Sequence, residues 1–198
     1  MNKTIVVALF GAAGAGKDAL QKEILKQSPY LCHGIISTTT RPPRENETDG
    51  VDYFFISEID AQNKLEDNDY LEYSEFRGWK YGTLKSSLCP GQINIGVFNV
   101  AGVKSLFSLP SKDYLILPIR ILCNDKTRLQ RQLDREQYPD CHEICRRFMA
   151  DEQDLSPKNL TFPYFDLLND GYCLQEAGAK ALKIIYEGLL SNTLFGQN

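Results

Sequence analysis

Runs of apolar residues alternate along this chain with segments in which apolar and polar residues mix. The most apolar runs, Thr4–Phe10 and Tyr114–Cys123, are typical of strands buried inside a sheet. Mixed segments such as Ala19–Lys26 and Leu174–Leu190 instead indicate helices with one buried face. This alternation of strands and helices predicts an α/β fold with a parallel core sheet.

The same pattern of apolar and polar residues predicts the remaining strands and helices, and it also marks two irregular segments. The segments 41–81 and 125–155 depart from simple alternation, because the first has short strands with little helix and the second is highly charged. Further strands are expected at Ile35–Thr39, Tyr53–Ile56, Tyr70–Phe76, Trp79–Tyr81, Ile93–Asn99 and Asp166–Leu168. Further helices are expected at about 57–66, 84–88, 103–109, 126–136 and 142–155.

A glycine-rich loop of the form G-x-x-x-x-G-K joins the first strand to the first helix. Backbone N–H groups of such a loop and the helix N-terminus cradle phosphate groups, and its lysine reaches the outer phosphates. The motif usually continues with Ser or Thr, whose hydroxyl binds Mg²⁺. Here Asp18 follows, and its carboxylate is also a hard oxygen ligand, so Asp18 is the candidate Mg²⁺ ligand. The predicted ATP-binding residues are Gly11, Ala12, Ala13, Gly14, Ala15, Gly16, Lys17 and Asp18.

The phosphate loop suggests roles for the two irregular segments. In a P-loop enzyme they are an acceptor-binding insert and a mobile lid, which excludes water and brings cationic groups to the transferring phosphoryl group. We therefore predict one P-loop NTPase-like domain with helices flanking the parallel sheet, a small mixed-strand insert and a helical lid. Its expected parts are a core at about 1–36, 84–124 and 156–198, an insert at about 37–83 and a lid at about 125–155.

Composition narrows the classes of function. A chain of 198 residues, 42% of them hydrophobic, suffices for one domain with a core. Its net charge of −4 indicates no general affinity for nucleic acid or for an acidic membrane. No apolar stretch is long enough to span a bilayer, and no export signal is recognisable. We therefore expect a cytoplasmic protein whose six scattered cysteines are reduced.

A second set of chemical groups lies in the segment predicted to bind the acceptor. From Thr39 to Phe55 the sequence follows the pattern T-T-R-x-x-R-x-x-E-x-x-G-x-D-Y-x-F. Its two arginines, Arg41 and Arg44, suit a dianionic phosphate, because guanidinium forks match phosphate oxygens. Hydroxyl groups such as those of Tyr53 and Tyr81 add neutral donors to the same phosphate.

Further along the chain, Glu72 offers a carboxylate that can accept hydrogen bonds from two neighbouring donors of a ligand. With these features the sequence resembles the guanylate kinase family over nearly its whole length, including residues 101–104 and 168–170. The resemblance implies reversible phosphoryl transfer from MgATP to GMP or dGMP, with no nucleic-acid or membrane partner. It also implies the GMP-binding residues, which are Arg41, Arg44, Tyr53 and Tyr81 for the phosphate and Ser37, Glu72 and Thr83 for guanine.

The resemblance further implies which residues act from the lid and beside the donor. Arg147 matches the family's I-x-x-R pattern, and Arg135 is preferred to Arg131 for an imperfectly matched R-L-x-x-R pattern. The alternative for these arginines is a charged helix face. Asn169 is expected near the adenine of ATP, with a cap before the final helix as the alternative. The predicted catalytic residues are Lys17, Arg41, Arg135 and Arg147.

Two positions depart from the family's pattern. Asp18 replaces the usual Ser or Thr, and Asn99 stands where the family has an aspartate, so its amide is expected to hydrogen-bond the base or ribose of GMP. Ribose 1,5-bisphosphate kinases share both departures but lack the full T-T-R-x-x-R…D-Y motif, so (d)GMP is the favoured acceptor and the sugar phosphate the alternative. The alternative from another class is a guanylate-kinase-like module that binds a partner without catalysis. It is disfavoured because Lys17 and the loop glycines are present.

Overall fold

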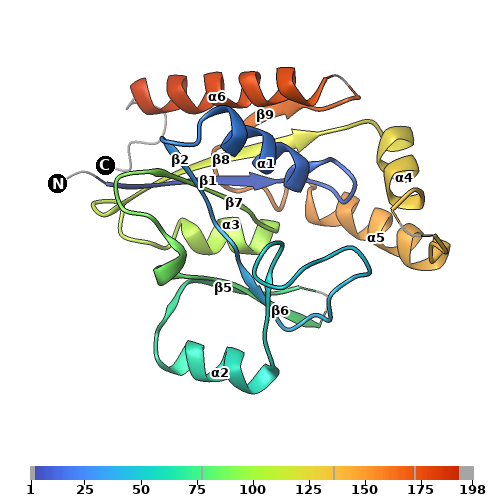
Figure 1. The fold of residues 1–198 in the computed structure, drawn as a ribbon, viewed down its shortest axis with the longest axis horizontal. Helices are drawn as coiled ribbons and strands as arrows, with labels where there is room; N and C mark the ends of the chain where they lie inside the picture. The colour runs from blue at the N-terminus through green and yellow to red at the C-terminus, as the bar shows by residue number, and fades with distance from the viewer. Residues whose placement is uncertain (1–2, 77, 136, 172, 192–198) are drawn as a thin grey trace.

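The computed structural model describes residues 3–76, 78–135, 137–171 and 173–191. Its core is a five-stranded parallel sheet in the order β2-β7-β1-β8-β9 (Figure 1). β1 is the middle strand and pairs with β7 on one side and β8 on the other. The predicted α/β class with a parallel core sheet is therefore confirmed. The core strands are β1 (Thr4–Phe10), β2 (Cys32–Gly34), β7 (Ile93–Val97), β8 (Tyr114–Leu122) and β9 (Phe165–Leu168).

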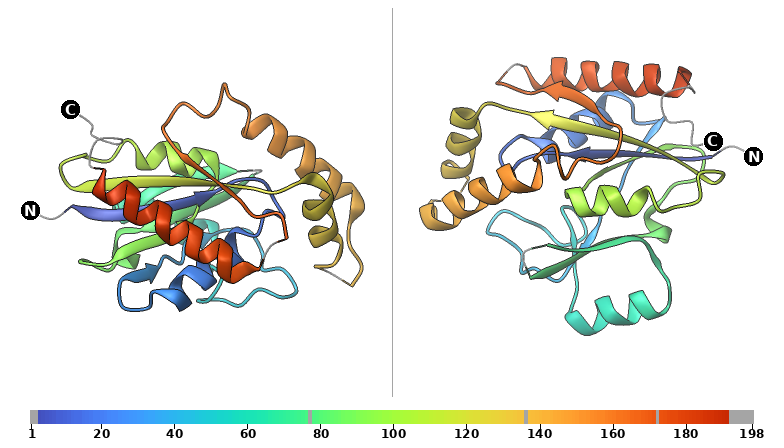
Figure 2. Two further views of the ribbon diagram at one scale, coloured as in Figure 1. Left: turned by 90° about the horizontal axis from the view of Figure 1, so that it is seen from above. Right: turned by 180° about the vertical axis from the view of Figure 1, so that it is seen from behind.

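Successive side chains of β1 enter two hydrophobic clusters, one on each face of the sheet. Leu9 packs with residues of α1 and α6, whereas Phe10 packs with residues of α3 on the opposite face. Figures 1 and 2 show α1 and α6 on one side of the sheet and α3 on the other. A strand buried on both faces requires a continuous apolar sequence, which explains why β1 is apolar from Ile5 onward. The covering helices are α1 (Lys17–Gln27), α3 (Val100–Leu106) and α6 (Leu174–Leu190).

A second sheet, which includes β5 and β6, lies beside the core (Figure 1). It has four strands in the order β4-β3-β6-β5. β3 pairs in parallel with β4 and antiparallel with β6, so this sheet is mixed. The antiparallel pairing of β5 with β6 places Glu72 opposite Thr83. The elements of this region are β3 (Thr38–Thr39), β4 (Phe54–Phe55), α2 (Glu58–Glu66), β5 (Tyr70–Phe76), β6 (Trp79–Leu84) and the 3₁₀ turn η1 (Lys85–Ser87).

Two charged helices, α4 (Asp125–Leu133) and α5 (Cys141–Asp154), follow β8. They lie at the end of the core sheet where β1 and β8 terminate (Figures 1 and 2). The side chains of Asn124 and Asp140 cap them by accepting hydrogen bonds from backbone N–H groups of their first turns. Among the helices described, none has both the length and the apolar character needed to cross a bilayer.

Several predicted elements differ from the structure only in their bounds, and two differ more substantially. Of the strand expected at Ile35–Thr39, only Thr38–Thr39 is a strand (β3), whereas β2 ends at Gly34, just before the predicted range, because the chain leaves the first sheet there and enters the second at Thr38. The helix expected at 84–88 is only the 3₁₀ turn η1, because Leu84 is still paired with β5 in the second sheet. In both cases a long-range strand pairing overrides the local pattern.

Candidate functional site

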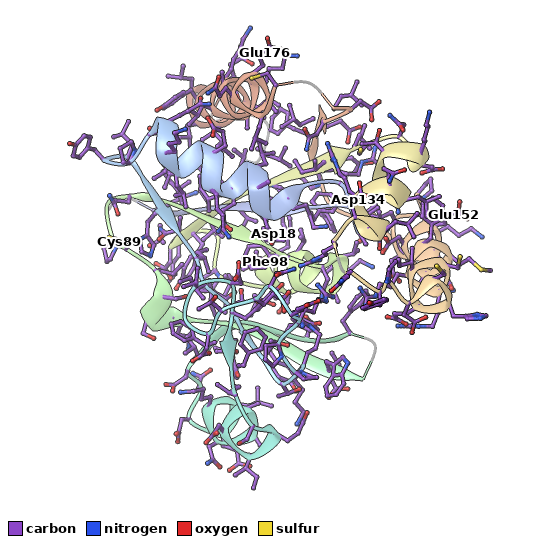
Figure 3. All side chains as sticks on the ribbon, turned by 45° about the vertical axis from the view of Figure 1, so that its right-hand side comes forward. Asp18, Cys89, Phe98, Asp134, Glu152 and Glu176 are labelled. Atoms are coloured by element: carbon purple, nitrogen blue, oxygen red, sulfur yellow. The ribbon has the colours of Figure 1, made fainter. Side chains whose placement is uncertain are left out.

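A cavity of about 440 Å³ lies between the loop after β1, the second sheet and the α4–α5 region. Asp18 and Phe98, both labelled in Figure 3, belong to its wall. Most of the residues predicted for the two substrate sites line this one cavity. They are Gly11, Ala13, Gly14, Gly16, Lys17 and Asp18 from the donor side, Ser37, Arg44, Tyr53, Glu72, Tyr81 and Asn99 from the acceptor side, and Arg135 and Arg147 from the α4–α5 region. Five predicted residues lie outside the lining, namely Ala12, Ala15, Arg41, Thr83 and Asn169.

The loop between β1 and α1 has a backbone that depends on its glycines. Gly11, Gly14 and Gly16 have φ values of 140°, 78° and 88°, a region that side chains with a Cβ rarely adopt. A Cβ at Gly14 would lie 2.5 Å from the backbone oxygen of Arg128, so α4 packs directly on the loop. The loop ends at Lys17, the first residue of α1, whose N-terminus is suited to an anion.

The amine of Lys17 folds back onto the loop. Its Nζ donates to the backbone oxygens of Gly11, at 2.9 Å, and Ala12, at 3.0 Å. Desolvation lowers the pKa of Lys17, whereas the nearby carboxylates of Asp18 and Asp151 oppose that shift. A phosphate in the cavity would offer this cation a stronger, charged partner than the carbonyls it contacts now.

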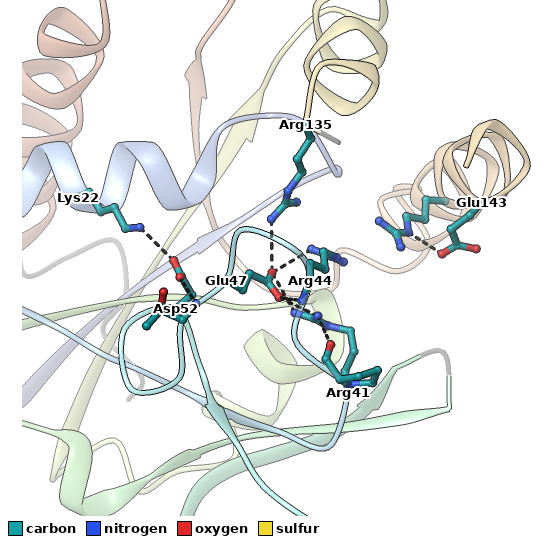
Figure 4. Close-up of polar contacts among 10 residues, drawn as sticks. Lys22, Arg41, Arg44, Glu47, Asp52, Arg135 and Glu143 are labelled. Atoms are coloured by element: carbon teal, nitrogen blue, oxygen red, sulfur yellow. Dashed lines mark hydrogen bonds and ion pairs between the residues drawn. The ribbon is translucent and has the colours of Figure 1, made fainter. Parts of the chain in front are cut away.

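One carboxylate, that of Glu47, joins the arginines at the acceptor end of the cavity (Figure 4). It accepts hydrogen bonds from Arg41 at 2.9 and 3.1 Å and from the side chain of Arg44 at 3.3 Å, and only 6% of its side chain is exposed. Arg135 reaches the same carboxylate at 3.4 Å. The sequence pattern contained Glu47 but gave no indication that it gathers three guanidinium groups from two parts of the chain.

The two predicted phosphate-binding tyrosines pack against each other and against Arg41. The rings of Tyr53 and Tyr81 meet edge to face with centroids 6.1 Å apart. The guanidinium carbon of Arg41 lies 5.4 Å from the ring centroid of Tyr53, a cation–π distance. Burial, followed by the negative charge of Asp18, raises the pKa of Tyr53, so its hydroxyl remains a proton donor at neutral pH.

The residues predicted to recognise guanine form one connected polar group. Glu72 is 5% exposed, and Thr83 on the neighbouring strand donates to its carboxyl group from both the hydroxyl and the backbone N–H. Thr83 also shares a hydrogen bond of 3.0 Å with Ser37. Burial raises the pKa of Glu72 to about 7, although the bonds from Thr83 oppose this shift. Thr83 is fully buried behind the cavity wall, where it contacts the lining residues Ser37 and Glu72.

Asn99 already has protein partners on both ends of its amide. Its Oδ1 accepts from the N–H of Gly102 at 2.7 Å, which caps α3 and explains why that helix begins at Val100 rather than at the predicted position 103. Its Nδ2 donates to the hydroxyl of Ser74 at 3.1 Å. Ser74 also lines the cavity, and no sequence signal marked it.

Asn169 supports the phosphate loop from outside the cavity lining. Its Nδ2 donates to the backbone oxygen of Ala15 at 2.8 Å, and the residue is 3% exposed. The N-cap residue of α6 is Cys173, four positions after Asn169. Arg131, the residue set aside in favour of Arg135, donates to the backbone oxygen of Gly14 at 3.2 Å and lines the cavity as Arg135 does.

Arg147 has a partner on its own helix and also lines the cavity. Its Nε donates to Glu143 at 2.6 Å, one turn earlier on α5. Hydrogen bonds from Arg146 and then Arg147 lower the pKa of Glu143 to about 2. The contact with Glu143 agrees with the helix-face alternative, and the position of Arg147 in the cavity lining agrees with the lid role.

The chemistry of Asp18 suits a magnesium ion. Its carboxylate is exposed, lines the cavity beside Lys17 and lies near enough to Tyr53 to affect that phenol. Mg²⁺ is usually held by one or two carboxylates together with phosphate oxygens and water. Within the described ranges, no group of three or more His, Cys, Asp or Glu side chains is assembled for a metal.

A glycine-rich strand–loop–helix unit and a cluster of arginines across the same cavity are the arrangement expected of a P-loop phosphotransferase. Residues 1–184 match the sequence model of the guanylate kinase family, and the chain belongs to this family. It is therefore a nucleoside monophosphate kinase, a transferase that binds nucleotides.

Individual relatives agree with this membership. The guanylate kinase of Synechococcus elongatus is 33% identical over 157 residues, which cover 76% of this chain and 82% of that protein. The guanylate kinase of Sulfurimonas denitrificans is 32% identical over 188 residues, which cover 91% of this chain and 85% of that protein. The crystal structure of guanylate kinase from Anaplasma phagocytophilum aligns with a TM-score of 0.66 over 98% of this chain and 90% of that one. At 14% sequence identity, this likeness concerns the fold.

Proposed function

We propose that this protein phosphorylates GMP or dGMP with ATP, giving ADP and GDP or dGDP. The observation that carries the proposal is a single cavity that joins the phosphate loop to the group formed by Arg44, Tyr53 and Glu72. Two polyanions can therefore meet in one cavity, which phosphoryl transfer requires. A phosphate oxygen of GMP attacks the γ-phosphorus of ATP, and the bond to the β,γ-bridging oxygen breaks.

The donor phosphates belong at the loop from Gly11 to Asp18. There the amides of the loop and the amine of Lys17 bind the negatively charged phosphates, and Asp18 would hold Mg²⁺ together with phosphate oxygens. A bound Mg²⁺ would neutralise charge on the transferring group. Arg135 and Arg147, which line the cavity between the two ends, are the candidates to stabilise the transition state from the α4–α5 region.

The acceptor belongs at the second sheet. Arg44 lines the cavity and Arg41 lies behind it, so we assign the first to direct contact with the phosphate of GMP and the second to support through Glu47 and Tyr53. The ionised Glu72 would accept from the N1–H and the exocyclic amine of guanine. Since Thr83 fixes this carboxyl group from β6, guanine is favoured over adenine.

A coupled assay of ADP release tests the proposal. MgATP is supplied with GMP, dGMP, AMP, UMP or ribose 1,5-bisphosphate in separate reactions. We expect turnover with GMP, dGMP or both, at rates far above those with AMP and UMP. Turnover with the sugar bisphosphate alone would replace the guanine assignment. An absence of turnover with every acceptor, from protein shown to be folded, would favour a binding module.

A matched pair of variants locates guanine recognition on β5. Glu72→Gln removes the carboxylate that accepts from guanine, whereas Glu75→Gln changes an exposed carboxylate on the same strand. We expect the first variant to raise the KM for GMP at least tenfold while the KM for ATP stays near its original value. Equal losses for both nucleotides would contradict the assignment of Glu72 to the acceptor.

A further inference from the structure

One residue of the phosphate loop, Ala13, has both of its backbone polar groups bound by side chains of α4 and α5. Its N–H donates to Asp151 Oδ2 at 2.7 Å, and its carbonyl oxygen accepts from Arg128 Nε at 3.1 Å. The two side chains also meet each other, with Arg128 Nη2 at 3.2 Å from Asp151 Oδ2. Ala13, Arg128 and Asp151 thus close a ring of three contacts across residues far apart in the sequence.

The two side chains of this ring are buried, and other residues of α4 and α5 support Arg128. Arg128 is 6% exposed and Asp151 is 8% exposed. Arg128 Nη1 also pairs with Asp125 at 2.9 Å, and its guanidinium carbon lies 4.3 Å from the ring centroid of Phe148. Long polar side chains lose considerable freedom when buried in one geometry, so such an arrangement persists only where its contacts compensate.

The geometry has a direct consequence for the amides of the loop. The carbonyl of Ala13 and the N–H of Gly14 belong to the same planar trans peptide and point in opposite directions. Because Arg128 holds that carbonyl on the α4 side, the N–H of Gly14 is turned away from Arg128. The glycine at position 14, with φ of 78°, has too little intrinsic preference to fix this plane by itself. Gly14 itself lines the cavity.

We propose that Arg128 and Asp151 are positioning residues that fix the peptide planes on both sides of Ala13, so that the phosphate loop is preorganised for the donor phosphates. The inference rests on the proposed function, in which that loop binds ATP. Asp151 acts here as a hydrogen-bond acceptor, and Arg128 balances its charge next to a polyanion site. Removal of either side chain frees the loop but leaves its backbone amides and Lys17 in place; Asp151 itself also lines the cavity, whereas Arg128 does not.

Four single variants test this assignment. Asp151→Ala deletes the acceptor, Asp151→Asn keeps an oxygen that can accept from Ala13, and Arg128→Lys keeps the charge but not the guanidinium fork that reaches Ala13 and Asp151 together. Glu152→Ala, an exposed position on the same helix (labelled in Figure 3), is the control. The dissociation constant of MgATP is measured without acceptor, alongside KM for each nucleotide, kcat and the melting temperature.

We expect Asp151→Ala and Arg128→Lys to weaken ATP binding about tenfold, the loss typical of one hydrogen bond to a charged group. Asp151→Asn should stay within about threefold of the unaltered protein, the control should not change, and KM for GMP should be the same in all. Unchanged ATP affinity in Asp151→Ala would overturn the proposal. Tighter ATP binding would also overturn it, because the carboxylate would then be a competitor for the loop.

The outcomes separate this inference from the proposed function and from misfolding. If the unaltered protein binds ATP but does not phosphorylate GMP, the proposed function fails, while the ATP affinities of the variants still decide the role of the ring. If Asp151→Ala does not fold, the comparison of Asp151→Asn with Arg128→Lys decides instead, because only the second is expected to lose ATP affinity. Equal affinities in those two variants would contradict the proposal.

Discussion

Replacement of the buried Glu72 by glutamine should stabilise the ligand-free protein, by an amount that depends on pH. The pKa of Glu72 is raised from its ordinary value of 4.5 to about 7. At about 1.36 kcal/mol per pH unit, this difference corresponds to about 3 kcal/mol. Since the folded-state pKa lies above the unfolded value, the stability is fully present below pH 4.5 and is lost as the pH rises toward 7. Glutamine does not ionise, so Glu72→Gln removes this loss.

The assay is urea unfolding at a series of pH values for the original protein and for Glu72→Gln. The free energies of unfolding should be similar near pH 4, where Glu72 is protonated in both states. At pH 8 the variant should be more stable by about 3 kcal/mol, which moves the melting temperature by roughly 6–12 °C for a chain of this size. The same variant should bind GMP poorly, so stability and acceptor affinity change in opposite directions.

Glu75→Gln is the control, because Glu75 lies on the same strand but is exposed. Its stability relative to the original protein should not change with pH in this range. A stability difference between Glu72→Gln and the original protein that is the same at pH 4 and pH 8 would refute the reasoning. It would mean that the carboxyl group of Glu72 is as well solvated or as well paired in the folded state as in the unfolded chain.

Three further predictions concern the donor side. Asp18→Ala should raise the Mg²⁺ concentration needed for half-maximal turnover, and Asp18→Ser should restore it; equal, unimpaired rates in both would rule out a metal role. Asn169→Ala should lower the free energy of unfolding by about 1–3 kcal/mol, because the buried carbonyl of Ala15 loses its donor, and urea unfolding would show this. Gly14→Ala should weaken ATP binding at least tenfold with little change in GMP affinity, since a Cβ there meets the backbone of α4; isothermal titration with each nucleotide would expose an effect on both or on neither.

The parts of the fold that sequence reasoning predicted are those with strong local signals. The apolar run of β1 and the glycines after it determine a buried strand and a loop within a single stretch of about fifteen residues. β2 was misplaced because Cys32–Gly34 has little strand character of its own. It is a strand only because it pairs with β7, some sixty residues later.

For the candidate site too, the residues with strong local signals were predicted and those held by long-range contacts were not. Residue types with obvious chemistry, such as Lys17 and Glu72, were predicted, and both line the cavity. What the sequence did not indicate are the side chains that hold those groups in place. The contact of Asp151 with Ala13 joins residues 138 positions apart, and no local pattern relates them.

The sharing of one carboxylate among three arginines has a consequence for how the acceptor end responds to its ligand. Arg41, Arg44 and Arg135 carry three positive charges and Glu47 one negative charge, so the cluster holds an excess of two cations before any substrate arrives. A fully ionised monophosphate carries two negative charges. Its entry would bring the cluster to electroneutrality, whereas a neutral sugar or a free base would leave two counterions to be recruited from solvent.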